Sequence, residues 1–171
     1  MGSGKTTVGK ILANRLRMPF KDLDQEFELK FGIGASKFYA TKGEKLFRET
    51  ERKILLEIIK NNNQVISTGG GAPCFSDNMD IMNREGVTVY LKMNRESILQ
   101  RLLMLKPSSI ARRLLIAEKS KEEIMRFVET NMDTREIFYG KAGIIVSNDS
   151  NDACVAVENI ISKLLLYDNK N

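Results

Sequence analysis

The chain has 171 residues, with 27 Lys and Arg against 22 Asp and Glu, a length that fits one domain, residues 1–171, rather than two. It contains no histidine, which excludes the commonest general base and metal ligand and leaves acid–base or metal chemistry to carboxylates and hydroxyls. The two cysteines lack C-x-x-C spacing and are too few for a disulfide framework. No apolar run reaches the ~18 residues of a membrane span. We therefore expect a cytoplasmic protein.

The chain opens on a glycine-rich run, Gly2-Ser3-Gly4-Lys5-Thr6-Thr7, that matches the second half of the motif G-x-x-x-x-G-K-[ST]. In such a P-loop, backbone N–H groups surround phosphate oxygens, the lysine reaches the β- and γ-phosphates, and the next hydroxyl meets Mg²⁺. Apolar residues then recur at helical spacing and predict a helix from about Lys5 to Arg17, whose positive end faces the anion. A chance glycine-rich helix cap is the alternative, and the Lys-Thr pair at a helix start favours the P-loop.

The opening of this motif is cut short. Its first glycine would fall two residues before Met1, and the strand that should precede a P-loop is missing from the sequence. We expect a coding sequence that starts further upstream, and a degenerate relative is the alternative. In the first case, unpaired strand edges should make the 171-residue form poorly soluble and weak in ATP binding.

An acidic pair follows the first helix. The segment Pro19 to Leu23 predicts a short extended piece leading into Asp22 and Asp24, with a helix after it. Such a pair alone is more often a turn or a helix cap, and its place after the P-loop helix favours a functional role. The segment from Gly43 to Asn61 carries apolar residues on one side, Leu46 among them, and predicts an amphipathic helix.

The second half of the chain alternates strands with helices, which implies a parallel sheet covered on both faces. Runs of β-branched apolar residues predict strands at Val65-Ile66, Val87–Leu91 and Ile144–Val146. Helical patterns extend from about Arg95 to Leu105, Lys121 to Phe138 and Ala153 to Leu166. The pattern breaks at residues 106–109, which predicts a mobile loop. Methionines expected to fill the core are Met79, Met82 and Met104.

Three glycines and two arginines carry further candidate chemistry. Gly69-Gly70-Gly71 follows a predicted strand, where open α/β sheets present backbone to ligands, and a flexible turn is the alternative. Arg48 is followed one helical turn later by Glu51, which could orient it. Taken singly, Arg48 or Arg135 is more often a solvated helix charge, whereas bidentate pairing of a carboxylate is geometry that lysine cannot copy.

Together these motifs resemble the shikimate kinase signature over nearly the whole chain. The P-loop is followed in order by Asp22-Leu23-Asp24, Phe47-Arg48-Glu49-Thr50-Glu51, Ser67-Thr68-Gly69-Gly70-Gly71-Ala72-Pro73, Arg112-Arg113-Leu114-Leu115 and Arg135-Glu136-Ile137-Phe138-Tyr139. The resemblance implies an α/β P-loop NTPase-type three-layer sandwich. Its parallel sheet would have five strands, the first missing from this sequence, with helices on both faces and a lid at about residues 106–120.

The resemblance also implies the activity. The γ-phosphoryl of ATP would pass to the 3-hydroxyl of shikimate, giving shikimate 3-phosphate and ADP in chorismate and aromatic amino-acid biosynthesis. The implied cofactor is Mg²⁺, the partners are the small molecules ATP and shikimate without nucleic acid or membrane, and the chain is a monomer. The alternatives are a related kinase for gluconate or a nucleoside monophosphate, against which the triple glycine and both arginine motifs argue, and a non-catalytic nucleotide-binding or interaction protein.

Residue roles follow from the same resemblance, with the substrate region at about residues 22–60. Asp24 would bind the ring hydroxyls and help to activate the one attacked, and Arg112 would swing over the phosphates. Arg113 stands where the family carries proline, and Arg101 resembles a residue that packs on adenine in relatives. The implied catalytic residues are Lys5, Asp22, Asp24 and Arg112; the nucleotide site is Gly2, Ser3, Gly4, Lys5, Thr6, Thr7 and Arg112; the substrate site is Asp24, Arg48, Gly70 and Arg135; and the metal site is Thr6 and Asp22.

Overall fold

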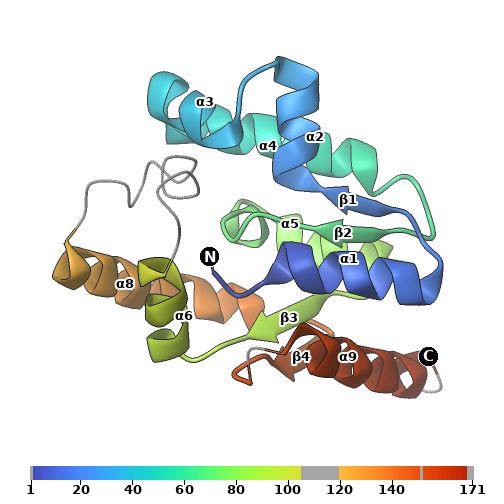
Figure 1. Cartoon of the computed structure of the whole chain (residues 1–171). Helices are drawn as coiled ribbons and strands as arrows, with labels where there is room; N and C mark the ends of the chain where they lie inside the picture. Colours follow the sequence, from blue (N-terminus) through green and yellow to red (C-terminus); the bar gives the residue numbers. More distant parts are fainter. Residues whose placement is uncertain (1, 105–119, 151, 169–171) are drawn as a thin grey trace.

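The computed structural model describes residues 2–104, 120–150 and 152–168 (Figure 1). Four short strands form two parallel pairs: β1 (Phe20–Asp22) with β2 (Val65–Ser67), and β3 (Val89–Lys92) with β4 (Ile144–Ser147). Within the described residues, β2 and β3 do not pair with each other. All the strands predicted from the sequence are present, but they form two pairs rather than one continuous five-stranded sheet, because no described strand bridges β2 and β3.

The first helix, α1 (Lys5–Leu16), packs against both β1 and β2 and against the closing helix α9 (Ala153–Asp168) (Figure 1). Gly9 allows this close approach, since a Cβ there would lie 2.6 Å from a ring carbon of Phe20. Buried apolar side chains of α1, α9, β3 and β4 then form one core. The start of α1, where the P-loop residues lie, is thereby fixed at the carboxyl ends of the strands.

A second core lies among three helices that pack together next to β1: α2 (Leu23–Phe31), α3 (Ala35–Lys42) and α4 (Glu44–Ile58) (Figure 1). Its centre is Phe27, whose ring lies 5.1 Å from that of Phe38 and 5.3 Å from that of Phe47, centroid to centroid. The predicted apolar side of α4 is correct except at Leu46, which is 46% exposed.

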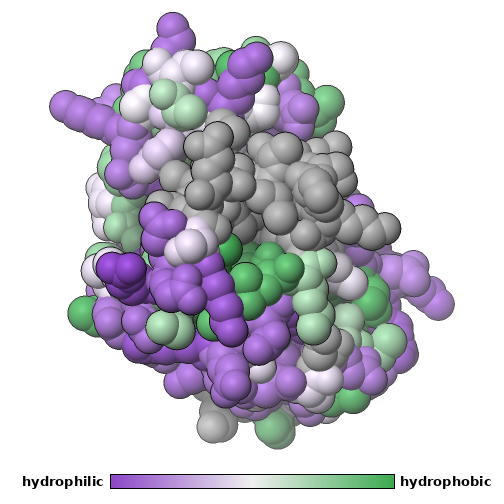
Figure 2. All heavy atoms as spheres, turned by 60° about the vertical axis from the view of Figure 1, so that its left-hand side comes forward, coloured by the Kyte–Doolittle hydropathy of each residue, from purple (hydrophilic) through white to green (hydrophobic). Residues whose placement is uncertain are grey.

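The third core joins α6 (Arg95–Leu103) to α8 (Lys121–Tyr139). In chain order, β2 is connected to β3 through the 3₁₀ turn η1 (Ala72–Cys74) and the helix α5 (Asn78–Glu85). The core prediction holds for Met79 but is wrong for Met104, which is 78% exposed because α6 ends before it. Figure 2 views α6 and α8 from outside and shows apolar atoms within a largely polar surface. The exposed apolar side chains of this region include Leu103, Met104 and Met125.

The mobile loop and lid expected at residues 106–120 lie, except for Ser120, outside the described residues, as do Arg112 and Arg113. No helix among residues 2–104, 120–150 and 152–168 is long and apolar enough to cross a membrane.

Candidate active site

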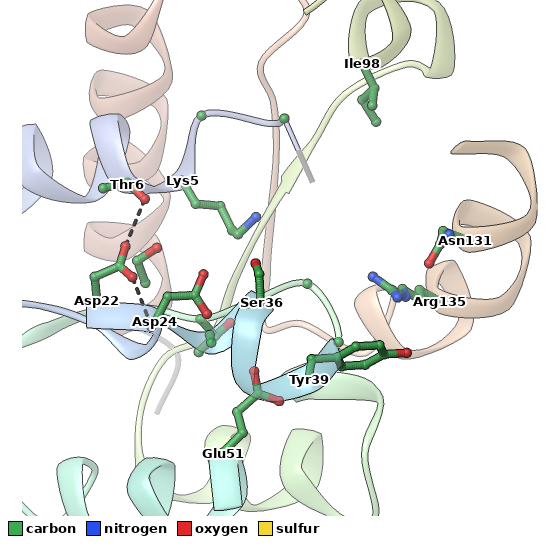
Figure 3. Close-up of a pocket in the computed structure, with 18 of the residues that line it drawn as sticks. Lys5, Thr6, Asp22, Asp24, Ser36, Tyr39, Glu51, Ile98, Asn131 and Arg135 are labelled. Carbon is green, nitrogen blue, oxygen red and sulfur yellow. Dashed lines mark hydrogen bonds between the residues drawn. The ribbon is translucent and has the colours of Figure 1, made fainter. Parts of the chain in front are cut away.

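One cavity of about 680 Å³ runs between the start of α1 and the helices α3, α4 and α8 (Figure 3). Predicted site residues that line it are Gly2, Gly4, Lys5, Thr6, Thr7, Asp22, Asp24, Arg48, Gly70 and Arg135. Ser3 does not line the cavity, because its side chain is buried beneath the loop. Arg112 lies outside the described residues. The structure therefore brings together ten of the predicted residues, which lie far apart in the sequence.

The nucleotide end of the cavity is the P-loop. Gly4 precedes α1 with a φ of +86°, a conformation that glycine adopts without strain and that begins the turn into the helix. The first N–H groups of α1 have no partners within the helix and face the loop side, where they attract anions. Lys5 extends from this turn into the cavity, with its Nζ 3.5 Å from the Oγ of Ser3 (Figure 3).

Asp22 connects the P-loop to the acidic pair. Its Oδ2 accepts a hydrogen bond of 2.9 Å from the hydroxyl of Thr6, and its Oδ1 accepts one of 3.1 Å from the N–H of Asp24 (Figure 3). The second bond makes Asp22 the N-cap of α2, so the helix-cap reading and the functional reading of this residue are compatible. Asp24, one residue into the helix, is exposed to the cavity.

The opposite end of the cavity holds an ion pair. Arg48 Nη1 lies 2.5 Å from Oε2 of Glu51, a side chain that is only 2% exposed. Burial raises the pKa of Glu51, and the charge of Arg48 opposes that rise. The guanidinium of Arg48 also lies against Gly71, where a Cβ would be 2.2 Å from Nη2. A side chain at Gly71 would therefore displace the guanidinium of Arg48 from its present position.

Helix α8 supplies the other side of this end. Its last residue, Tyr139, donates a hydrogen bond of 2.7 Å to the carbonyl of Gly70, and burial raises the pKa of Tyr139 while Arg135 opposes that rise. Arg48 from α4 and Arg135 from α8 both line this end of the cavity, and both oppose the rise that burial causes in the pKa of the Cys74 thiol. Two arginines and a main-chain turn thus line the end of the cavity remote from the P-loop.

Several residues at the cavity were missed by the sequence reasoning. Ser36 and Tyr39 reach it from α3, and Asn131 from α8 (Figure 3). Asn148, directly after β4, donates from Nδ2 to the carbonyl of Ser3 over 2.8 Å. None of these residues belongs to a local sequence motif. The fold alone brings them to the site, so no signal in the sequence marks them.

A phosphate-binding loop facing carboxylate and guanidinium groups across one cavity defines a P-loop kinase of small molecules. The family model described as shikimate kinase matches residues 1–165. A shikimate kinase from Azobacteroides pseudotrichonymphae is 44% identical over 96% of this chain and 95% of its own length. The chain belongs to the shikimate kinase family.

Solved structures agree. The shikimate kinase of Bacteroides thetaiotaomicron has a TM-score of 0.88 and 38% identity, covering 96% of this chain and 93% of that one. The shikimate kinase of Acinetobacter baumannii, in complex with shikimate, has a TM-score of 0.86 and 29% identity, covering 96% and 88%. The family, the P-loop α/β fold class and an ATP-dependent kinase activity predicted from the sequence are confirmed.

Proposed function

We propose that this chain transfers the γ-phosphoryl of ATP to the 3-hydroxyl of shikimate, giving shikimate 3-phosphate and ADP. The observation that carries the proposal is one cavity lined by the P-loop at one end and by Arg48 and Arg135 at the other. Such a cavity can hold a triphosphate and a small carboxylic acid at once, and the reaction requires the two to meet in line.

The acid would be held by its carboxylate. Arg48 and Arg135 present planar guanidinium groups, which pair with carboxylates through two parallel hydrogen bonds. The Gly70 main chain, held by Tyr139, lies beside them. With the carboxylate at this end, the ring hydroxyls point back toward Asp24 and the P-loop, which is the direction that transfer requires.

The transfer itself asks for little covalent chemistry from the protein. The substrate hydroxyl oxygen forms a bond to the γ-phosphorus, its proton passes to the carboxylate of Asp24, and the bond to the β-phosphate oxygen breaks to release ADP. Lys5 and the N–H groups of the P-loop stabilise the negative charge on the phosphate oxygens. We retain Arg112 as the lid arginine of this step on the family resemblance alone.

The residues at the P-loop also fit Mg²⁺. The hydroxyl of Thr6 donates to Asp22, which leaves the lone pairs of Thr6 and the second lone pairs of Asp22 for a hard cation. Mg²⁺ commonly takes only one or two protein oxygens beside substrate phosphates, and no cluster of three acidic or thiol ligands occurs in the described part of the chain. When bound, the ion would neutralise charge on the transferring phosphoryl group.

We further propose a monomer of one domain, with residues 22–60 as the substrate-binding region, because a single chain supplies both ends of the cavity. We also propose a cytoplasmic location, because the reaction uses ATP and because both cysteines, Cys74 and Cys154, are free thiols. Size-exclusion chromatography with light scattering would test the monomer.

The experiment for the activity is release of ADP measured with shikimate, gluconate and AMP as separate acceptors. We expect release with shikimate and none above background with the other two, since neither offers a ring carboxylate to the arginine pair together with a hydroxyl near Asp24. Comparable release with gluconate would contradict the proposal.

A further inference from the structure

We propose that Asn148 is a positioning residue that orients the main chain of the P-loop toward the phosphates of ATP. It acts from behind the loop, on the side away from the cavity. The inference rests on the kinase function only in that ATP phosphates are what the loop binds.

The argument begins with the directions of two peptide groups. The carbonyl of Gly2 accepts a hydrogen bond of 2.9 Å from Nη1 of Arg101, and the carbonyl of Ser3 accepts one of 2.8 Å from Nδ2 of Asn148. In a planar trans peptide the C=O and the following N–H point in opposite directions. Because Arg101 and Asn148 hold these two carbonyls, the N–H groups of Ser3 and Gly4 point in the opposite direction. Successive N–H groups oriented in this way receive phosphate oxygens.

Both donors lie close to Gly4. A Cβ on Gly4 would be 3.1 Å from Nη1 of Arg101 and 3.4 Å from Nδ2 of Asn148. A side chain at this position would crowd Arg101, touch Asn148 and strain the positive φ. The glycine and the two donors form one unit, and this unit is what gives the loop its shape.

Asn148 is itself held firmly. Its backbone N–H donates to the carbonyl of Lys92 over 2.8 Å, which extends the β3–β4 pairing by one step. The next residue, Asp149, accepts a hydrogen bond of 2.7 Å from the N–H of Asn94, the N-cap of α6. Helix α6 in turn carries Arg101. The connection after β4 therefore links both donors to one rigid frame.

The side-chain amide of Asn148 is less favourable for stability than an apolar group would be at this buried position. The residue is 2% exposed, and within the described residues its buried Oδ1 has no hydrogen-bond partner. A buried unpaired acceptor is unfavourable for stability. An apolar side chain of the same size would avoid that cost and would lose only the bond to Ser3. The hydrogen bond that Nδ2 donates to the carbonyl of Ser3 therefore explains why this position carries an amide side chain.

The test is Asn148→Leu, which removes the donor and keeps the number and branching of the side-chain heavy atoms. We expect the Kd for ADP, by isothermal titration calorimetry, and the KM for ATP to rise about 5- to 10-fold, the effect of one hydrogen bond. The KM for shikimate at saturating ATP should stay within about twofold. The thermal midpoint should stay within about 4 °C, because losing the unpaired Oδ1 offsets the lost bond.

The matched control is Asn83→Leu. Asn83 also donates from Nδ2 to a main-chain carbonyl, that of Lys141 at 2.9 Å, but outside the cavity. We expect no change in ADP binding there. Asn148→Asp, which keeps the shape but loses the donor and adds charge, should weaken ADP binding further.

A wild-type Kd for ADP in Asn148→Leu would overturn the proposal, and so would equal rises of the ATP and shikimate KM values, which indicate general damage. ADP binding is measured without shikimate. A wild-type chain that binds ADP but does not phosphorylate shikimate would therefore overturn the proposed function and leave this test valid.

Discussion

The two ends of the cavity are built by different means. At the nucleotide end the contacts to phosphate come mainly from the main chain of the loop, whose carbonyls are held by Arg101 and Asn148. At the end that is proposed to bind the carboxylic acid (the acid end), the contacts would come from Arg48 and Arg135. Glu51 holds Arg48, and Tyr139 holds the neighbouring carbonyl of Gly70. The nucleotide end recognises any triphosphate, since backbone N–H groups read charge and shape. Under the proposed function, the end lined by Arg48 and Arg135 would select for one substrate.

This difference predicts where single substitutions act. At the acid end, removing a side chain removes a substrate contact directly. At the nucleotide end, a substitution weakens ATP binding to a similar extent only if it moves the main chain of the loop. The expected effects on catalysis are therefore largest for a side chain that would touch the reacting hydroxyl, smaller for the arginines that would bind the carboxylate, and smallest for residues that only support other residues.

The largest effect is expected for Asp24→Asn, which keeps the shape of the side chain and removes its charge. Because the ionised carboxylate takes the proton of the attacking hydroxyl, kcat should fall by about 10²- to 10⁴-fold. Steady-state kinetics with both substrates varied measures this, and Asp80→Asn on the surface of α5 is the control. A defect confined to the KM for shikimate would make Asp24 a binding group only.

Next come Arg48→Ala and Arg135→Ala. Each removes charged hydrogen bonds of about 1.5–3 kcal/mol, so kcat/KM for shikimate should fall about 10- to 100-fold or more, while the KM for ATP changes little. Arg→Lys at either position should recover only part of the loss, because lysine cannot make the bidentate pair. Wild-type kinetics in either Ala variant would remove that arginine from the site.

Gly71→Ala should act on Arg48 without touching the substrate. A Cβ would lie 2.2 Å from Nη2 of Arg48, so the guanidinium must move, and we expect the KM for shikimate to rise about tenfold. Gly86→Ala is the matched control, since nothing lies within 4 Å of a Cβ there. If both variants show wild-type KM values, the placement of Arg48 against Gly71 does not matter for binding.

The smallest effect is expected for Tyr139→Phe, which deletes the hydrogen bond to the carbonyl of Gly70. The KM for shikimate should rise about two- to tenfold, in line with a bond of about 0.5–1.5 kcal/mol. Tyr90→Phe is a close control. Its ring lies 5.1 Å from that of Tyr139, and its buried hydroxyl has no hydrogen-bond partner in the described part of the chain. Equal effects of the two substitutions would assign Tyr139 a packing role.

Much of this arrangement could be predicted from the sequence, because its motifs carry their own local chemistry. The P-loop run, the acidic pair after a short strand and the three glycines after another all lie at strand or helix ends that the sequence pattern marks. The spacing of Arg48 and Glu51 on one helix face was also sufficient to predict their contact, which the structure shows at 2.5 Å.

The rest depends on tertiary contacts. Helix α3 has no buried residue among those described for it, so its apolar pattern gives no helical signal, and the cavity residues Ser36 and Tyr39 could not be found from it. Asn148 contacts Ser3 across 145 positions of sequence. The exposure of Met104 follows from where α6 ends, and ends of elements are poorly marked in sequence.

The most direct measurement of the central claim is to identify the product by ³¹P and ¹H NMR after incubation of the chain with Mg²⁺, ATP and shikimate. In the proposed binding mode, the carboxylate lies at the arginine pair and one ring hydroxyl lies near Asp24 and Lys5. The account predicts a single phosphate ester, coupled to the proton at carbon 3 of the ring, formed in equal amount to ADP. A phosphate ester at another hydroxyl, or ADP formed without any ester, would contradict it.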